Sequence, residues 1–182
     1  MININKIKIT MFRLFKKPTV KVINKSKNQL PEYKTDGAAC MDVRANLPEL
    51  LKDMKYFGNV KSTTDDNGNL VISLMPKSRI MIPTGLYMQL PKNYKLSIKP
   101  RSGIAWDFGV TVLNTPGTLD SDYNGELKII LINSGNHEFK IRQGDRIAQI
   151  EIEKVIKHTW KSVLKLDETS RGAGGFGHSG RN

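Results

Sequence analysis

Residues 100–103 read Pro-Arg-Ser-Gly and end a stretch of alternating apolar and polar residues. Arg101 offers a positive charge, Ser102 a hydroxyl group, and Gly103 a backbone N–H group that no side chain shields. These are the donor types that bind a chain of phosphate groups. Loops of this composition are also common on protein surfaces that bind nothing. Taken alone, the segment leaves phosphate binding and an ordinary strand-ending turn both open.

Residues 117–126 place two carboxylates and a phenol directly before a strongly apolar stretch. In an extended chain Asp120 and Asp122 point to the same face, because side chains alternate along a strand. One of them can then act as a general base while the other orients a partner or a metal. Two solvated acids of a surface loop fit the same residues. The segment on its own therefore leaves catalysis and a plain loop open.

Residues 171–180 combine a run of glycines with one arginine, Arg171, and one phenylalanine, Phe176. So much glycine gives the segment too much conformational freedom to fold on its own. An arginine and an aromatic ring within it are typical of an arm that closes over a ligand with an anionic end and a flat ring. The sequence contains no Walker-type lysine loop and no dinucleotide fingerprint after a strand, which excludes nucleotide binding by those two motifs.

Alternation of apolar and polar residues from about residue 80 onward predicts the short strands that position these groups. Leu96 and Ile98 share one face of such a strand, so Arg101 points to the other face and is available to a ligand. Along residues 146–153 the predicted core face consists of Ala148, Ile150 and Ile152, and the opposite face includes Ile147 and Gln149.

Turn signals rich in proline, glycine and asparagine separate these strands, and together they predict an all-β sandwich or barrel. Residues 47–57 differ, because their apolar residues recur at helical spacing behind Asn46 as a cap, which predicts one short helix. Residues 66–68, Asp-Asn-Gly, then predict a hairpin turn before a strand at 70–72. This helix and hairpin look like an insertion over about residues 47–70.

The chain has 182 residues, of which 38% are hydrophobic and 25% charged, which suits one soluble domain with its own core. No window approaches the ~20 apolar residues of a membrane-spanning helix. A single cysteine, Cys40, excludes an internal disulfide and a cysteine-built zinc site. It also indicates a reducing compartment, and we expect a cytoplasmic protein.

The formal net charge is +12, and most of the surplus lies near the N-terminus. Residues 1–31 hold eight lysines and arginines and no acid, whereas the rest of the chain has an ordinary charge balance. Such a segment is typical of a solvated tail. Contact with nucleic acid or an anionic membrane, and organelle targeting, stay open as roles for this basic leader.

Taken in chain order, five segments resemble the five motifs of the trimeric dUTP diphosphatases (dUTPases), over nearly the whole chain from about Thr19 to Gly180. The matching segments are residues 39–43, 100–105, 117–126, 144–149 and 171–180. Five motifs in the same order make a highly specific match.

The resemblance implies an all-β subunit with a jelly-roll-like (β-clip) fold, in a homotrimer with three active sites at subunit interfaces and an exchanged C-terminal arm. The implied division of the chain is a basic flexible leader over residues 1–18, a β domain with the insertion over 19–169, and a glycine-rich mobile arm over 170–182. Each arm would reach over an active site built by neighbouring subunits.

The implied reaction is the hydrolysis of dUTP to dUMP and pyrophosphate, with Mg²⁺, by attack of water on the α-phosphorus. It keeps uracil out of DNA and supplies dUMP for dTMP synthesis. By this resemblance Asp120 orients and deprotonates the attacking water. Asp42 matches the acid near Mg²⁺ and acts through water, as expected for an ion that keeps much of its hydration shell.

The same resemblance implies the contacts with the substrate. Tyr123 packs against the sugar and excludes a ribose hydroxyl, while Phe176 stacks on uracil. Backbone groups of the hairpin 114–128 pair with uracil, and cytosine would leave them unpaired. The implied phosphate ligands are Arg101, Ser102, Gly103, Arg171 and Ser179, and Gln149 is implied as an outer-shell partner of the phosphates or of metal-bound waters. The other implied substrate-binding residues are Asn114, Gly117, Thr118, Leu119, Lys128 and Gly177.

Departures from the family pattern leave alternatives open. Cys40 replaces a glycine, His178 replaces a serine, and residues 106–108 form an unusual Trp-Asp-Phe run. A catalytically weak or inactive regulatory or binding protein with the same fold is the first alternative. A dCTP deaminase is less favoured, because Ile130 stands where that family has its catalytic glutamate.

Overall fold

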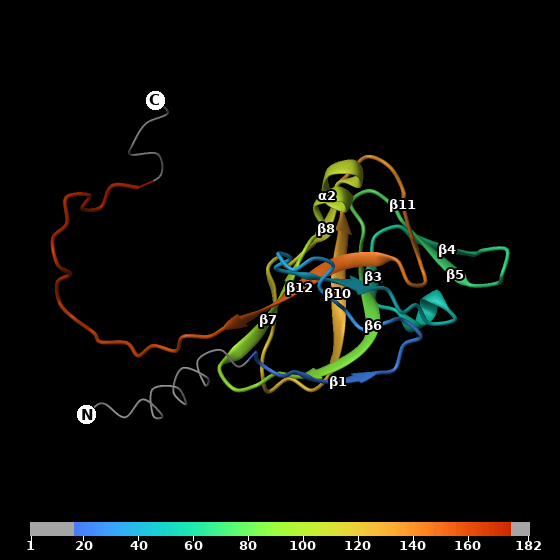
Figure 1. Cartoon of the computed structure of the whole chain (residues 1–182). Coiled ribbons are helices and arrows are strands. Elements are labelled where there is room, and N and C mark those ends of the chain that lie inside the picture. The colour runs from blue at the N-terminus through green and yellow to red at the C-terminus, as the bar shows by residue number, and fades with distance from the viewer. Residues whose placement is uncertain (1–16, 176–182) are drawn as a thin grey trace, which may run out of the picture.

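Figure 1 shows the computed structural model of the chain, in which residues 17–175 are described. The strands are β1 (Lys21–Asn24), β2 (Met41–Arg44), β3 (Tyr56–Phe57), β4 (Val60–Thr64), β5 (Leu70–Leu74), β6 (Arg79–Gln89), β7 (Tyr94–Lys99), β8 (Val110–Val112), β9 (Gly117–Leu119), β10 (Glu126–Asn133), β11 (Phe139–Arg142) and β12 (Arg146–Lys154). The helical elements are a 3₁₀ turn, η1 (Leu51–Asp53), and an α-helix, α2 (Ser102–Phe108).

The strands form three antiparallel sheets around one core. A five-stranded sheet has the order β1-β6-β10-β8, with β3 also paired to β6. A four-stranded sheet has the order β2-β12-β7-β9, and a three-stranded sheet has the order β11-β5-β4. Their inner faces meet in one buried cluster that includes Ile80, Leu96 and Leu131. The all-β prediction is confirmed for the described part of the chain.

The alternation predicted along β7 and β12 holds, with one exception. Leu96 and Ile98 are buried, and the Arg101 side chain is 25% exposed on the other side of the strand. Ile147 was expected on the outer face, and this prediction is wrong, because its exposure is only 1%. A register shift between Arg146 and Ala148 turns Ile147 inward, as an extra residue in a β-bulge does.

The short helix predicted within residues 47–57 is confirmed only as a single 3₁₀ turn. Only η1 is helical there, and Leu50, not Asn46, precedes it without a side-chain cap. Met54 is buried, while Tyr56 and Phe57 pair with Ile80 and Arg79 of β6. One turn is enough to bring Leu51 and Met54 to the core, and the pairing of residues 56–57 with β6 replaces the rest of the expected helix.

The hairpin predicted around residues 66–68 is confirmed. Strands β4 and β5 pair from Val60–Leu74 to Thr64–Leu70. The Asp65 carboxylate accepts hydrogen bonds from the N–H groups of Asn67 and Asn69 across the turn. These hydrogen bonds, led by those from Asn69, lower the pKa of Asp65.

Helix α2 begins at Ser102, inside the Pro-Arg-Ser-Gly segment, where the sequence indicated only a turn. The helix ends at Phe108 and is capped by Gly109, whose φ of +65° suits glycine. A side chain there would also lie 2.7 Å from the backbone of Gly135. The Phe108 ring lies 5.2 Å from that of Phe139, whereas Trp106 is 90% exposed. Of the two unusual aromatic residues, Phe108 therefore packs against another ring, and Trp106 is exposed.

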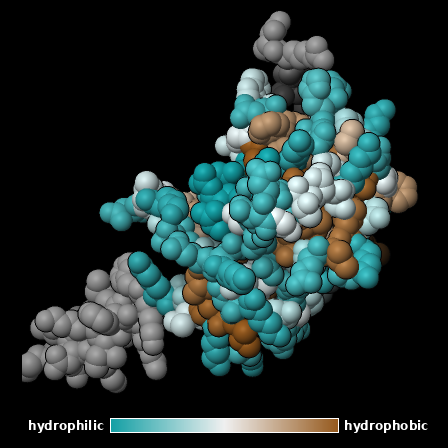
Figure 2. Space-filling view, turned by 90° about the vertical axis from the view of Figure 1, so that its right-hand side faces the viewer, coloured by the Kyte–Doolittle hydropathy of each residue, from teal (hydrophilic) through white to brown (hydrophobic). Residues whose placement is uncertain are grey.

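Beyond β12, residues 155–175 leave the body as an extended trace, coloured orange to red in Figure 1. Figure 2 shows apolar patches between polar residues on one face of the molecule. Within the described range, no helix is long and apolar enough to cross a membrane.

Candidate active site

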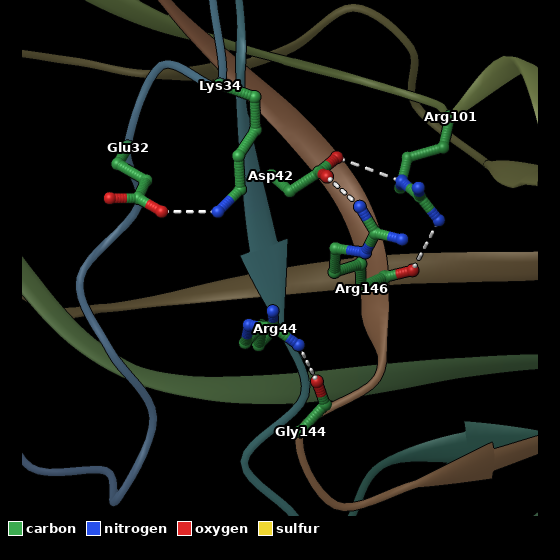
Figure 3. Close-up of polar contacts among 7 residues, drawn as sticks. All are labelled: Glu32, Lys34, Asp42, Arg44, Arg101, Gly144 and Arg146. Carbon is green, nitrogen blue, oxygen red and sulfur yellow. Dashed lines mark hydrogen bonds and ion pairs between the residues drawn. The ribbon is translucent and has the colours of Figure 1, made fainter.

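Asp42 of β2 joins two arginines that come from distant parts of the chain (Figure 3). Its Oδ1 accepts a hydrogen bond from Arg101 Nε at 2.9 Å, and its Oδ2 accepts one from Arg146 Nη1 at 3.0 Å. Arg101 Nη1 also donates to the backbone oxygen of Arg146 at 3.2 Å. We call these three residues the arginine cluster. Two guanidinium groups against one carboxylate leave the cluster positive, as binding of an anion requires.

The pairing of three strands creates this cluster. Strand β12 lies between β2 and β7, with Gln149 opposite both Asp42 and Lys99. Arg146 thus begins β12 beside Asp42, and Arg101 leaves the end of β7 on the same side. Motifs that are far apart in sequence meet because their strands are neighbours in one sheet.

Arg101 keeps donors for a ligand. A guanidinium group carries five N–H donors, and only two of those of Arg101 are used in the hydrogen bonds described here. Ser102 and Gly103 are exposed in the first turn of α2, where backbone N–H groups have no partner within the helix. Gln149 Nε2 donates to the backbone oxygen of Pro100 at 2.7 Å. Gln149 therefore braces the segment that presents Arg101 and Ser102.

Further cations surround the cluster. Arg44 Nη1 donates to the backbone oxygen of Gly144 at 2.7 Å, which ties β2 to the turn before β12. Lys34 pairs with Glu32 on the exposed loop before β2. Its hydrogen bond lowers the pKa of Glu32.

A pocket of about 270 Å³ lies where the third predicted motif crosses between two sheets. Strands β8 and β10 belong to the five-stranded sheet, whereas β9 pairs with β7 in the other. We call this the nucleoside pocket, after the ligand that the resemblance predicts for it. Its wall is formed by Met81, Ile98, Asn114, Thr118, Leu119, Asp120, Tyr123, Glu126, Leu127, Lys128 and Ile130. All of the predicted base and sugar contacts that fall on described residues lie here, apart from the neighbouring Gly117.

Two side chains of the pocket wall differ in their contacts: that of Tyr123 is held by a hydrogen bond, and that of Asp120 is not. Tyr123 OH donates to the backbone oxygen of Glu126 at 3.3 Å, and any side chain at Gly125 would collide with this hydroxyl at 2.2 Å. Asp120 is exposed, and within residues 17–175 its side chain makes no hydrogen bond or ion pair with the protein. Both Asp120 oxygens are thus free to accept hydrogen bonds from water.

The nucleoside pocket and the arginine cluster are two separate sets of residues. None of Asp42, Arg101 and Arg146 lines the pocket. Arg171 is exposed, and its Nε donates to the backbone oxygen of Gly174. Predicted ligands Phe176, Gly177 and Ser179 lie outside the described residues, as do most of the basic leader and His178.

A larger cavity of about 630 Å³ lies between residues 17–20, the loop 33–38, Met41 and Ile152. It contains none of the predicted site residues, so size alone does not mark the site in this chain.

The donors that the structure describes suit only a lightly held metal ion. Among residues 17–175 no three His, Cys, Asp or Glu side chains gather into a metal-binding group. Asp42 is one carboxylate, and each of its oxygens already accepts a guanidinium N–H. Mg²⁺ usually keeps several waters and binds through one or two carboxylates plus substrate phosphates. The residues present therefore fit Mg²⁺ that arrives with a triphosphate.

Comparison with known proteins decides the family. The dUTPase family model matches residues 69–180. The chain is 42% identical over 166 residues to a deoxyuridine 5'-triphosphate nucleotidohydrolase from Fusobacterium nucleatum, covering 91% of this chain and 99% of the relative. It is 47% identical over 151 residues to the protein of the same name from Treponema denticola, covering 83% and 90%. This chain belongs to the dUTPase family.

A solved dUTPase of Staphylococcus bacteriophage 80alpha with dUPNHPP shares the fold, with a TM-score of 0.70, 21% identity, and coverage of 89% of this chain and 98% of that chain. A dUTPase mutant from phage phi11 of S. aureus, described for its coordination of a structural Mg(II) ion, has a TM-score of 0.62 at 18% identity, and the match covers 81% of this chain and 97% of that chain. The family and fold predicted from the sequence are confirmed. The predicted activity, hydrolysis of dUTP, is the activity after which the relatives are named, and the alternatives are not favoured.

Sequence reasoning passed over Arg146. It lies in the fourth dUTPase motif, but its partner Asp42 is 104 residues away in the chain. The only signal was a cation at the start of a strand whose next polar residue, Gln149, was expected to point outward.

Proposed function

We propose that this chain hydrolyses dUTP to dUMP and pyrophosphate by attack of water on the α-phosphorus. The observation that carries the proposal is the nucleoside pocket, with Asp120 and Tyr123 in its wall, in a chain of the dUTPase family. The reaction keeps uracil out of DNA and supplies dUMP for dTMP synthesis. Cys40 is a free thiol, in keeping with a reaction in the cytoplasm.

Deoxyuridine binds in the nucleoside pocket. Backbone groups along the hairpin that begins at Asn114 pair with uracil. Thr118, Leu119 and Lys128 form part of the pocket wall, and Gly117 lies next to it in β9. Cytosine presents the reversed pattern of donors and acceptors and would leave these groups unpaired.

Tyr123 discriminates between deoxyribose and ribose. Its ring is held against Gly125 by the hydrogen bond of its hydroxyl to Glu126. The ring packs against C2′ and leaves no room for a ribose hydroxyl, so UTP is rejected.

Asp120 is the general base. It accepts a proton from the attacking water and orients the water toward the α-phosphorus. A base of this kind supplies a factor of about 10² to 10⁴ in rate. The side chain suits this role because it lines the pocket and is not occupied by a partner within the described range.

Arg101, Ser102 and Gly103 bind the phosphate chain, and the arginine cluster supports them. Positive charge here stabilises the charge that develops on the departing pyrophosphate. Asp42 and Arg146 hold the Arg101 guanidinium in place, and Gln149 holds the preceding backbone. Mg²⁺, held by the phosphates and through water by Asp42, would neutralise further charge on the triphosphate.

The complete site combines residues from different copies of the chain in a homotrimer. In support, the nucleoside pocket and the arginine cluster share no residue. Residues 155–175 leave the body with exposed apolar side chains, among them Trp160 and Leu164. The arm that follows closes over a neighbouring site, with Arg171 and Ser179 on the terminal phosphate and Phe176 and Gly177 over uracil.

The test is release of pyrophosphate from dUTP, dCTP, dTTP and UTP with Mg²⁺, for the native chain and for Asp120→Asn. We expect turnover of dUTP alone, reduced about 10³-fold in the variant. Asp122→Asn is the matched control, since Asp122 does not line the pocket. Unchanged turnover in Asp120→Asn would show that another group is the base, and no turnover by the native chain would refute the proposed function.

A further inference from the structure

Strands β6 and β10 lose their regular register beside the nucleoside pocket. Glu126 lies opposite Tyr87, and Lys128 lies opposite Pro83. Between these pairs β10 has one residue, Leu127, while β6 has three, residues 84–86. A bulge of this type bends its strand and often re-aims side chains next to an active site. Here it determines where the first residues of β10 lie in the pocket wall.

Side chains hold the bulge in one conformation. Thr84 Oγ1 donates to the backbone oxygen of Leu127 at 2.6 Å, and the Gly85 N–H group donates to Glu126 Oε1 at 2.8 Å. Gly85 has a φ of +71°, and a Cβ there would lie 2.7 Å from Cβ of Ser26. Because Gly85 is buried, its N–H group would lose its partner, at a cost in free energy, if the Glu126 carboxylate were removed.

Glu126 also contacts the pocket wall on its other sides. Its Oε2 lies 3.6 Å from Lys128 Nζ, and its side chain is only 16% exposed. Its backbone oxygen accepts the hydrogen bond of Tyr123. One residue thus connects the bulge of β6 to both Tyr123 and Lys128, which line the pocket.

We propose that Glu126 is a positioning residue that determines the specificity of the nucleoside pocket. The inference rests on the proposed hydrolysis of dUTP. Glu126 holds the β6 bulge against the start of β10, and this fixes Tyr123 at the distance from C2′ that excludes a ribose. Without the carboxylate the bulge relaxes, β10 shifts, and the pocket accepts ribonucleotides. We expect the rate of the chemical step to change less than substrate binding, because the Asp120 side chain has no hydrogen bond to Glu126 within the described residues.

Two substitutions separate the two contacts of the carboxylate. Glu126→Met keeps the length of the side chain but removes both the acceptor for Gly85 and the charge facing Lys128. Glu126→Gln keeps an acceptor oxygen for the Gly85 N–H group and removes only the charge. Glu138→Met is the matched control, since Glu138 accepts a hydrogen bond from Ser73 in the three-stranded sheet, away from the pocket.

The measurements are kcat and KM for dUTP and UTP, the Kd values of dUMP and UMP, and the midpoint of thermal unfolding. For Glu126→Met we expect KM for dUTP to rise about tenfold, kcat to change less than about threefold, and the preference for dUTP over UTP to fall about tenfold. Glu126→Gln recovers most of the preference, and Glu138→Met leaves it unchanged. Thr84→Val, which releases the Leu127 oxygen, acts in the same direction as Glu126→Met.

Native-like KM and selectivity in folded Glu126→Met would overturn the inference. An equal loss of rate on both nucleotides, together with a lower unfolding midpoint, would show a purely structural role and would also overturn it. Failure of the proposed function is recognised separately, because the native chain would then not hydrolyse dUTP. The Kd ratio of dUMP to UMP in native and variant chains still decides the inference in that case.

Discussion

The β-sheet body and the segment 155–175 use the same apolar residue types with opposite results. In the body, Leu74, Ile129 and Leu131 are at most 1% exposed. In the segment, Trp160 is 91% exposed and Leu164 fully so. Burying a leucine side chain contributes ~1.5–3 kcal/mol, and the described part of one chain leaves Trp160 and Leu164 unburied.

The contrast assigns the two regions different tasks. The body carries its own core and positions the nucleoside pocket and the arginine cluster, whereas the segment has apolar side chains that the described part of its own chain leaves exposed. Exposed apolar surface of this kind marks an interaction site. The predictions below separate the regions, beginning with the largest effect.

Ending the chain after Lys154 should abolish turnover of dUTP, by about 10³-fold or more, because Arg171 and its arm are lost with the segment. The β-sheet signal in circular dichroism should stay, since all described strands end at or before Lys154. Loss of the sheet signal would show instead that the segment is needed for the body to fold. Removal of residues 1–16 alone is the control, and it should leave turnover unchanged.

A matched pair of leucine truncations compares the regions directly. Leu131→Ala should lower the free energy of unfolding by about 2–5 kcal/mol at any protein concentration, because it opens a cavity in the core. Leu164→Ala should leave the unfolding of a dissociated chain unchanged and weaken assembly. Urea unfolding at several concentrations, with sedimentation to measure assembly, checks both. An equal, concentration-independent loss in the two variants contradicts the division of tasks.

Asp42→Asn tests the arginine cluster within the body. The variant removes the carboxylate from two charge-assisted hydrogen bonds and leaves two guanidinium groups facing each other. At about 1.5–3 kcal/mol for a hydrogen bond to a charged group, kcat/KM for dUTP should fall about tenfold to a hundredfold. Steady-state kinetics beside Asp53→Asn, an exposed aspartate of η1, provides the comparison. A native value in Asp42→Asn would mean that Arg101 needs no support.

Cys40 gives the smallest effect. Burial raises the pKa of its thiol, and nearby Glu151 raises it further, while Lys99 opposes this less strongly. A raised pKa means less thiolate at pH 8, so alkylation should be several-fold slower than for a free cysteine. Glu151→Gln should speed it up. Rapid alkylation of the native chain would show that the thiol is freer than the structure places it.

Much of the body could be predicted from sequence, because alternation reports directly on faces. Leu96 and Ile98 turn inward and leave Arg101 outward, as the pattern indicated. Alternation fails at Ile147, where a bulge adds one residue and reverses the face. It also fails for residues 47–57, because pairing of Tyr56 with Ile80 depends on a strand that is remote in sequence.

The functional site, too, could be predicted from the sequence only in part. The residue types of the phosphate segment and the pocket hairpin suggested their chemistry, since Arg101 and Asp120 belong to short continuous motifs. Arg146 and Glu126 were missed as functional groups because their partners, Asp42 and Gly85, lie far away in sequence. Only strand register brings such residues together.

The central claim is that the nucleoside pocket and the arginine cluster of one chain belong to active sites completed by different copies. Its most direct test mixes equal amounts of Asp120→Asn and Arg101→Gln, each inactive alone, and refolds them together. In a mixed trimer a site needs intact Asp120 from one copy and intact Arg101 from another, so random assembly should restore roughly a quarter of native activity. If the mixture stays as inactive as its parts, both residues serve the site of their own chain and the claim is wrong.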